Sequence, residues 1–125
     1  MKRVYIAGPM SSSGNYIDNI RNAVSIAEEV YELGLCPYVP HLQAMWQLIS
    51  PHHEYGYWIP MDLEWLGTCS FLLRLPGESH GADLEADFAL SHGIPVVCSL
   101  QELKDMLGIN KDLLSNNKCY CWGDK

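Results

Sequence analysis

Short apolar runs alternate along the chain with stretches in which apolar side chains recur every three or four positions. The short runs are rich in Val, Ile, Leu and aromatic residues, as strands are, and they cover residues 4–7, 35–39, 70–75 and 94–99. Recurrence at three and four predicts amphipathic helices, of which the longest covers residues 15–33, before Gly34, and shorter ones cover residues 62–66, 81–92 and 101–107. The chain therefore alternates between predicted strands and predicted helices.

This alternation predicts an α/β fold with a single doubly wound parallel sheet, Rossmann-like or flavodoxin-like, and helices on both faces. No repeat or linker interrupts it, so we expect one domain over residues 1–125. Residues 41–58 are aromatic and rich in histidine, and we expect a short helix and a loop there. The apolar segment Cys119–Trp122 is expected to pair as an edge strand.

Ligands of such sheets bind beyond the carboxyl ends of the strands. The segments that follow the first three predicted strands are residues 8–14, 40–41 and 76–85. We therefore expect these three loops to face one crevice, which is the candidate binding site.

The composition is that of an ordinary globular domain, because 48% of the 125 residues are hydrophobic and 18% are charged. No apolar run approaches the roughly 20 residues that cross a bilayer, so we expect no membrane partner. The first residues, MKRVYIAGPM, have too short an apolar segment for a signal peptide and are predicted to enter the first strand. We therefore expect a cytoplasmic protein.

Acidic residues dominate the charge of the chain. Eight Lys and Arg stand against fifteen Asp and Glu, a net charge of −7, and residues 22–103 hold eleven acids but a single cation, Arg74. Nucleic-acid polymers are bound by clustered Lys and Arg, so we expect no such partner. A small phosphorylated ligand is compatible with the sequence, provided that backbone amides and hydroxyl groups hold it.

The five cysteines are Cys36, Cys69, Cys98, Cys119 and Cys121. Their number is odd and three of them lie in apolar runs, which favours buried free thiols in a reducing compartment over a disulfide framework. Cys119 and Cys121 supply two soft ligands, whereas a tetrahedral zinc site needs four. We expect neither a metal nor an organic cofactor.

The first loop, residues 8–14, lacks both the GxGxxG spacing of dinucleotide-binding folds and the Gly-Lys-Ser/Thr of a P-loop. It is a turn of small residues before a helix N-terminus, which suits an uncharged or anionic group that approaches backbone amides. A plain helix cap, with Ser13 or Asn15 bonding to free amides, explains the loop equally well.

Two acidic residues carry the candidate chemistry. Glu85 lies about one turn into a predicted helix, after Ser79 and Gly81. A helix dipole favours acids in a first turn, so Asp83 and Glu85 can be structural only. A carboxylate near free amides is also expected to stay ionised, as a nucleophile at an anomeric carbon must. Asp62 adds a second carboxyl group, and cleavage of a glycosidic bond requires one ionised and one proton-donating member.

Four segments carry a resemblance through their order and spacing: Val4-Tyr5-Ile6-Ala7-Gly8, Asp62-Leu63-Glu64-Trp65-Leu66, Leu75-Pro76-Gly77-Glu78-Ser79-His80-Gly81-Ala82-Asp83-Leu84-Glu85 and Gly93-Ile94-Pro95-Val96. Together they resemble the nucleoside 2-deoxyribosyltransferase superfamily. The chain is most similar to its branch of 2′-deoxynucleoside 5′-monophosphate N-glycosidases and related small phage and bacterial proteins. The resemblance runs from about residue 3 to residue 100.

The resemblance implies three catalytic residues. Glu85 would be the nucleophile that attacks C1′ of the sugar. Tyr5 would donate a hydrogen bond to that carboxylate and orient it. Asp62 would serve the departing base as proton donor or hydrogen-bond partner.

The same resemblance implies a set of substrate-binding residues: Gly8, Met10, Ser11, His41, Ser79 and Gly81. Ser79 and Gly81 match positions that hold the 5′-phosphate, and His41 matches a histidine beside the base. Gly8 and Met10 match the loop that lines the nucleotide. Related hydrolases often carry an arginine in that loop, where this chain has serines from Ser11 on, and an aromatic residue where it has Glu78. Phosphate selectivity would therefore depend on hydroxyls and amides.

We therefore expect an N-glycosidase that hydrolyses the base–sugar bond of a (deoxy)nucleoside 5′-monophosphate through a glycosyl-enzyme intermediate. Two alternatives stay open, a deoxyribosyltransferase that passes the sugar to another base and a nucleotide-binding protein without turnover. Trp46, Trp58 and Trp65 are more typical of core or subunit contacts than of a base-stacking wall, although they can form one. Because these aromatics lack an obvious internal partner, and because family members complete their pocket from a neighbouring subunit, we expect a homodimer or a larger homo-oligomer.

Overall fold

A computed structural model describes residues 1–11, 14–51, 53–54 and 56–108 of the chain. The strands are β1 (Arg3–Ala7), β2 (Cys36–Tyr38), β3 (Phe71–Arg74) and β4 (Val96–Val97). The helices are α1 (Tyr16–Glu32), α2 (Gln43–Ile49), α3 (Ile59–Leu66), α4 (His80–Ser91) and α5 (Leu100–Leu107), and a short 3-10 helix, η1 (Pro40–Leu42), precedes α2. Strands and helices alternate as the apolar pattern predicts.

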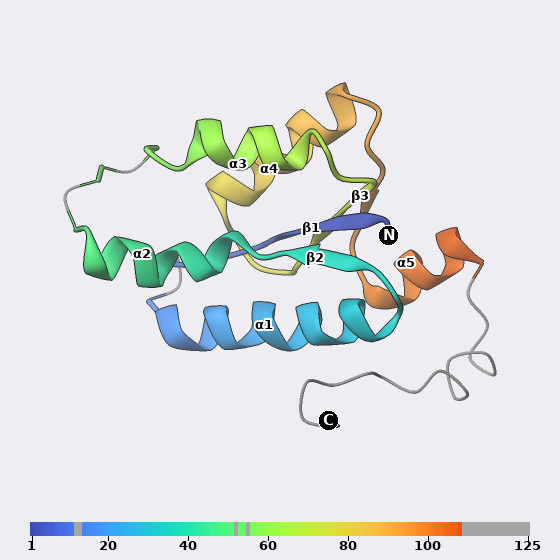
Figure 1. Cartoon of the computed structure of the whole chain (residues 1–125), viewed down its shortest axis with the longest axis horizontal. Coiled ribbons are helices and arrows are strands. Elements are labelled where there is room, and N and C mark those ends of the chain that lie inside the picture. Colours follow the sequence, from blue (N-terminus) through green and yellow to red (C-terminus); the bar gives the residue numbers. More distant parts are fainter. Residues whose placement is uncertain (12–13, 52, 55, 109–125) are drawn as a thin grey trace.

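The four strands form one parallel sheet in the order β2-β1-β3-β4 (Figure 1). This is the order of a flavodoxin-like sheet, in which the chain first winds toward one edge and then toward the other. Tyr5, in β1, pairs directly with Tyr38 in β2 and with Leu72 in β3. The predicted α/β fold with a doubly wound parallel sheet is confirmed.

Each face of the sheet has its own core, because successive side chains of a strand point to opposite faces. Val4 and Ile6 pack in one core with side chains of α1 and α5. Tyr5 and Ala7 pack in the other core with side chains of α3 and α4. Figure 1 shows α1 and α5 below the sheet and α3 and α4 above it. The helices on both faces are as predicted.

The fourth strand is shorter than predicted, because β4 covers Val96–Val97 instead of residues 94–99. It pairs with β3 alone in the described part of the chain, and Pro95 has no amide proton to extend that pairing. Ser99 already caps α5, since its Oγ accepts a hydrogen bond from the amide of Glu102. The continuous apolar run over residues 94–99 therefore does not show that β4 is a central strand. The strand predicted over residues 119–122 lies outside the described residues.

Three cysteines can be compared with the prediction of buried free thiols. Cys36, Cys69 and Cys98 are all free, but only Cys69 is buried. The prediction of burial is wrong for the other two, because Cys36 begins β2 and Cys98 follows β4, and these are the outer strands of the described sheet. Cys119 and Cys121 lie outside the described residues. No helix in the described part of the chain is long and apolar enough to cross a membrane.

Candidate active site

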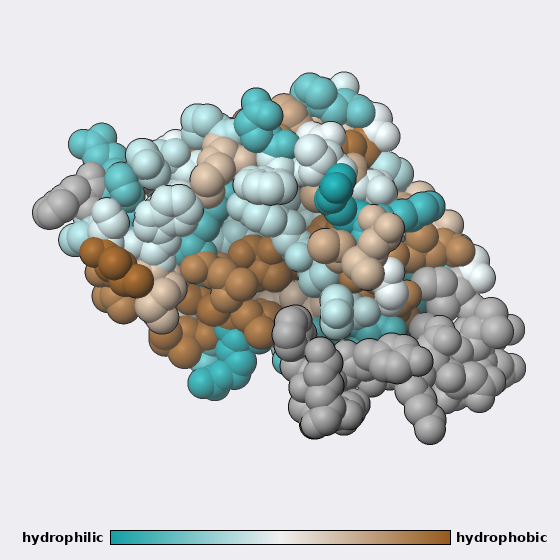
Figure 2. Space-filling view, in the orientation of Figure 1, coloured by the Kyte–Doolittle hydropathy of each residue, from teal (hydrophilic) through white to brown (hydrophobic). Residues whose placement is uncertain are grey.

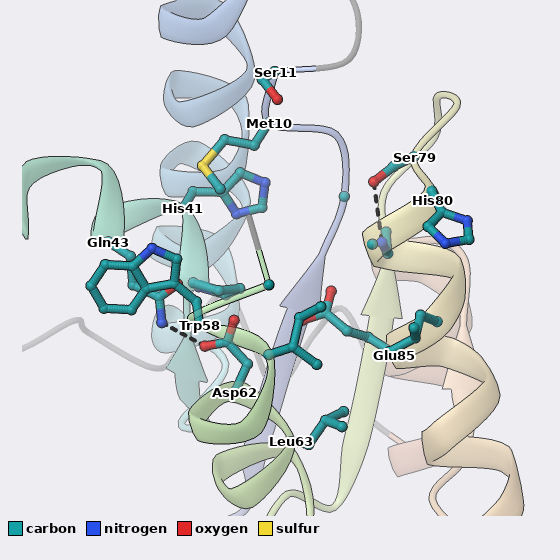
Figure 3. Close-up of a pocket in the computed structure, with 17 residues that line it drawn as sticks. Met10, Ser11, His41, Gln43, Trp58, Asp62, Leu63, Ser79, His80 and Glu85 are labelled. Atoms are coloured by element: carbon teal, nitrogen blue, oxygen red, sulfur yellow. Dashed lines mark hydrogen bonds between the residues drawn. The ribbon is translucent and has the colours of Figure 1, made fainter. Parts of the chain in front are cut away.

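A cavity of about 270 Å³ opens at the carboxyl end of the sheet (Figure 3). All three predicted loops line it, which confirms that they share one crevice: Gly8, Met10 and Ser11 after β1, Pro40 and His41 after β2, and Ser79, His80, Gly81, Ala82, Leu84 and Glu85 after β3. The segment between α2 and α3 and these two helices close the remaining side: Gln43, Gly56, Trp58, Ile59, Asp62 and Leu63. Each predicted site residue except Tyr5 is thus part of the lining.

Glu85 reaches the cavity from the second turn of α4, and Tyr5 supports it from behind. Tyr5 is fully buried in β1, and its hydroxyl donates a hydrogen bond to Glu85 Oε2. Burial and the nearby carboxyl groups of Glu85 and Asp62 raise the pKa of Tyr5 far above its ordinary value of 10, so its hydroxyl stays a donor. With Oε2 engaged by Tyr5, the other oxygen, Oε1, is the one left for a ligand.

The protonation of Glu85 differs from the prediction. The pKa of Glu85 is raised from 4.5 to about 7, chiefly by burial and also by the nearby Asp62, while the Tyr5 hydrogen bond and Arg74 oppose this rise. The expectation that helix amides keep this carboxylate fully ionised is wrong, because Glu85 lies beyond the first turn of α4, where the free amides are. Both protonation states of Glu85 are therefore populated near neutral pH.

Asp62 lies in the first turn of α3 and is 7% exposed. Its Oδ1 accepts two hydrogen bonds, one from Gln43 Nε2 and one, of 3.2 Å, from the Tyr38 hydroxyl. Burial raises the pKa of Asp62 above its ordinary value of 3.8, although both hydrogen bonds lower it. Asp62 is therefore a better proton donor near neutral pH than an exposed aspartate.

Glu85 and Asp62 form a coupled pair across the cavity, because the charge of Asp62 favours the protonated form of Glu85. Each carboxyl group keeps one oxygen occupied by a tyrosine hydroxyl, Tyr5 for Glu85 and Tyr38 for Asp62. Such a pair retains one shared proton more readily than it ionises completely. It can supply one carboxylate as nucleophile and one carboxylic acid as proton donor in the same cavity.

The N-terminus of α4 forms the end of the cavity that suits an anion. Ser79 caps this 12-residue helix, since its Oγ accepts a hydrogen bond of 3.1 Å from the amide of Ala82. The amides of His80 and Gly81 donate no hydrogen bond within the described part of the chain, and both residues line the cavity. Free amides and the helix dipole together attract negative groups.

His41 ties the second loop to the first. It is 2% exposed, and its Nε2 donates a hydrogen bond of 3.1 Å to the carbonyl oxygen of Pro9. Burial lowers the pKa of His41 below 6.5, so the ring is neutral at neutral pH, and its buried Nδ1 has no hydrogen-bond partner among the described residues. The first loop also approaches β3 closely, because a Cβ at Gly8 would lie 2.8 Å from Leu75 Cβ.

Trp58 provides a flat apolar wall of the cavity. Trp46 packs against it edge to face, with 4.8 Å between the ring centroids, and the Nε1 of Trp58 donates a hydrogen bond to Gln47. Trp65 does not line the cavity and stacks on Tyr38 instead. Of the three tryptophans considered from the sequence, Trp58 is therefore the one placed to contact a planar ring.

Sequence reasoning missed the two partners of Asp62, Tyr38 and Gln43. The one signal for Tyr38 was its residue type, a tyrosine in the second predicted strand. That it projects from the same face of the sheet as Tyr5 follows from the β1–β2 register. Gln43 gave no comparable signal, because its place depends on where η1 ends and α2 begins.

Positive charge is scarce around the cavity. Arg74 pairs with Asp83 at 3.0 Å and donates to backbone carbonyl oxygens, Gly77 O among them, and it is not part of the lining. Within the described residues, no three His, Cys, Asp or Glu side chains are grouped so that they could hold a metal ion. Ligand recognition here depends on hydrogen bonds and apolar contacts.

Comparison with known proteins gives a match to a family of unknown function. Residues 2–99 match the family described as Domain of unknown function (DUF7768). This span covers the whole sheet, α1–α4 and every residue that lines the cavity, and it ends before α5. No curated protein and no solved structure matches the chain.

Proposed function

The chain belongs to the DUF7768 family, and we propose that it is an N-glycosidase that hydrolyses the base–sugar bond of a (deoxy)nucleoside 5′-monophosphate. One observation carries the proposal: Glu85 and Asp62 face one cavity, and burial raises the pKa of both. The resemblance of the surrounding segments to the nucleoside 2-deoxyribosyltransferase superfamily supports the same reaction. The cavity volume of about 270 Å³ is near the lower end of the range of small-molecule sites.

In the proposed mechanism, the pair reacts in the form in which its proton lies on Asp62. The ionised Glu85 then attacks C1′ of the sugar through Oε1, and the bond between C1′ and the base nitrogen breaks. The electron pair of that bond goes to the base, which receives a proton from Asp62. A glycosyl ester of Glu85 results. Water then attacks C1′, with Asp62 accepting its proton, and releases the sugar phosphate and the free carboxylate.

Three features of the cavity position such a substrate. The amides of His80 and Gly81 and the Ser79 hydroxyl would donate hydrogen bonds to the 5′-phosphate at the start of α4. Trp58 and the apolar side chains beside it contact the base. In this proposal C1′ lies between the phosphate end and the base end of the cavity, beside Glu85.

The same ester would make the protein a deoxyribosyltransferase if a second base, instead of water, accepted the sugar. A nucleotide-binding protein without turnover is the alternative from a different functional class. Base release from deoxynucleoside monophosphates, followed by chromatography, separates the enzyme from the binding protein. Addition of a second free base separates transfer from hydrolysis.

The deciding experiment compares the wild-type protein with Glu85→Gln over a panel of nucleosides and monophosphates. Loss of a covalent nucleophile lowers the rate by several orders of magnitude. We expect wild-type base release and none above background for Glu85→Gln, with Asp87→Asn as a matched control, because Asp87 is exposed on the same helix. Turnover near the wild-type rate by folded Glu85→Gln would exclude this mechanism.

We also propose that the protein forms a homodimer or a larger homo-oligomer. Figure 2 shows apolar atoms gathered over α2 and the adjoining part of α1. Leu48 and Ile49, in α2, are 74% and 76% exposed, which is unusual for side chains of this kind. Light scattering at micromolar concentration should give a multiple of the 14.1 kDa chain mass. Leu48→Glu should reduce that mass, and a wild-type particle of one chain mass would contradict the proposal.

A further inference from the structure

We propose that Tyr38 is a positioning residue that acts through Asp62: its hydroxyl and Gln43 occupy Oδ1 of that carboxyl group, so that the transferable proton is carried on Oδ2, facing the cavity. The inference rests on the proposed function, because it gives Asp62 the role of acid. It concerns a residue that does not line the cavity.

The register of the sheet fixes the position of Tyr38. Tyr5 and Tyr38 are direct partners in the β1–β2 pairing, so their side chains leave the sheet on the same face. Their rings stack with 5.3 Å between centroids, and the ring of Trp65 also stacks on Tyr38, at 5.8 Å. A ring in contact with two aromatic neighbours has little freedom, so its hydroxyl has a fixed direction.

Three polar groups meet at that place. The Tyr38 hydroxyl donates to Asp62 Oδ1 at 3.2 Å and accepts from Gln43 Nε2 at 3.3 Å. Gln43 Nε2 also donates to Asp62 Oδ1. A phenol has one proton, and here Asp62 receives it. Two donors converge on Oδ1, whereas Oδ2 accepts no hydrogen bond from the described residues.

The position of the acid proton follows from this arrangement. An oxygen that already accepts two hydrogen bonds carries no proton of its own in that geometry, so a protonated Asp62 holds the proton on Oδ2. Figure 3 shows Gln43 bonded to one carboxyl oxygen of Asp62 while the other oxygen is turned toward the cavity. The proton therefore faces the position of the leaving group, and not Tyr38 or Gln43.

Tyr38 also affects how readily Asp62 holds that proton. Burial raises the pKa of Tyr38 to about 12, so the hydroxyl remains a donor and favours the ionised form of Asp62. Tyr5 from β1 and Glu85 from α4 are the other titratable groups that interact with Asp62, and His41 is the titratable side chain that η1 contributes to the cavity. Loss of the Tyr38 hydroxyl should therefore move the titration of Asp62 to higher pH.

The activity test compares Tyr38→Phe, which keeps the stacked ring and loses only the hydroxyl, with the wild-type protein on two kinds of substrate. Release of a natural base needs the Asp62 proton, whereas 4-nitrophenolate leaves a 4-nitrophenyl deoxyriboside 5′-phosphate without one. We expect kcat for base release to fall about tenfold with little change in KM. The burst of nitrophenolate that precedes hydrolysis of the ester reports the first step alone. Its rate should stay within about twofold of the wild-type rate, since the barrier of that step does not include the proton transfer.

Two further variants are controls for this comparison. Asp62→Asn should reproduce the selective loss, and Tyr31→Phe, at an exposed tyrosine of α1, should match the wild-type protein on both substrates. An equal loss by Tyr38→Phe on both substrates would mean that Tyr38 only supports the packing, and would overturn the proposal.

A second measurement does not depend on activity. In the Glu85→Gln background, where Asp62 is the remaining member of the carboxyl pair, the carbon-13 shift of the Asp62 carboxyl group reports its titration. We expect the midpoint in Tyr38→Phe/Glu85→Gln to lie about one pH unit above that in Glu85→Gln. An unchanged midpoint would overturn the coupling between Tyr38 and Asp62. Absence of base release by the wild-type protein would instead overturn the proposed function and leave this titration valid.

Discussion

Replacement of Glu85 by glutamine should stabilise the protein, by an amount that grows with pH. In the folded protein, burial raises the pKa of Glu85 from 4.5 to about 7. Between these two pH values the unfolded chain has released the proton and the folded protein has kept it. Stability therefore falls as pH rises through this window, and the contribution of the protonated side chain is complete only below about pH 4.5.

The size of the effect follows from the pKa. A tenfold change in proton affinity is worth about 1.4 kcal/mol, so the rise from 4.5 to about 7 corresponds to at most about 3.5 kcal/mol. The glutamine side chain of Glu85→Gln has nearly the same shape, and its carbonyl oxygen can still accept the Tyr5 hydrogen bond, but it has no proton to lose. Most of this difference in the free energy of unfolding, about 2–3 kcal/mol, develops between pH 5 and pH 8.

Urea unfolding at pH 5, 6, 7 and 8 measures this difference. The free energy of unfolding of Glu85→Gln minus that of the wild-type protein should increase by about 2–3 kcal/mol across the series. Asp62 is present in both proteins, so only its interaction with Glu85 contributes to this difference. Asp87→Asn, at an exposed position of α4, should differ from the wild-type protein by a constant amount. Parallel pH profiles for wild type and Glu85→Gln would refute the raised pKa of Glu85.

Four further outcomes are expected. Asp62→Asn should slow base release most for bases that leave poorly, and an equal loss across a panel of bases would exclude a leaving-group role. Ser79→Ala should weaken monophosphate binding by about 1–2 kcal/mol in calorimetry while nucleoside binding is nearly unchanged; equal losses would move the phosphate elsewhere. Because the protein is acidic, monophosphate binding should hold steady or tighten from low to physiological salt, and a collapse would contradict short-range recognition. Gly77→Ala should cost about 1–3 kcal/mol in urea unfolding, since φ there is +115° and a Cβ would lie 2.7 Å from Pro9 Cγ. Gly93→Ala, with positive φ but open space, should lose less.

The sequence was sufficient for the parts of the fold that depend on local pattern. The three-and-four spacing of apolar residues placed α1 within a residue of each end, because that helix buries one continuous stripe. The extent of β4 was not predictable in this way. Whether an apolar run is a central or an outer strand depends on which strands pair, and the pairing is a property of the whole sheet.

The candidate site also has features that the local sequence pattern predicts and features that depend on tertiary packing. Loop order along a parallel sheet was enough to bring Gly8, His41 and Ser79 to one cavity. The hydrogen bonds of Asp62 were not predictable, because they need the β1–β2 register and the exact start of α2. The raised pKa of Glu85 was not predictable either, since it depends on how far folding removes the side chain from water. Sequence reasoning identified the acids, and tertiary packing determines their protonation.

The alternation of side chains along β1 has a consequence for how this protein can change. Val4 and Ile6 belong to the core shared with α1 and α5, whereas Tyr5, one position away from each, supports the candidate nucleophile on the opposite face. Substitutions on the α1–α5 side can therefore alter stability while the cavity keeps its shape. Substitutions on the α3–α4 side change stability and chemistry together. Laboratory evolution of altered specificity would accordingly find its compensating mutations on the face of the sheet that never meets a ligand.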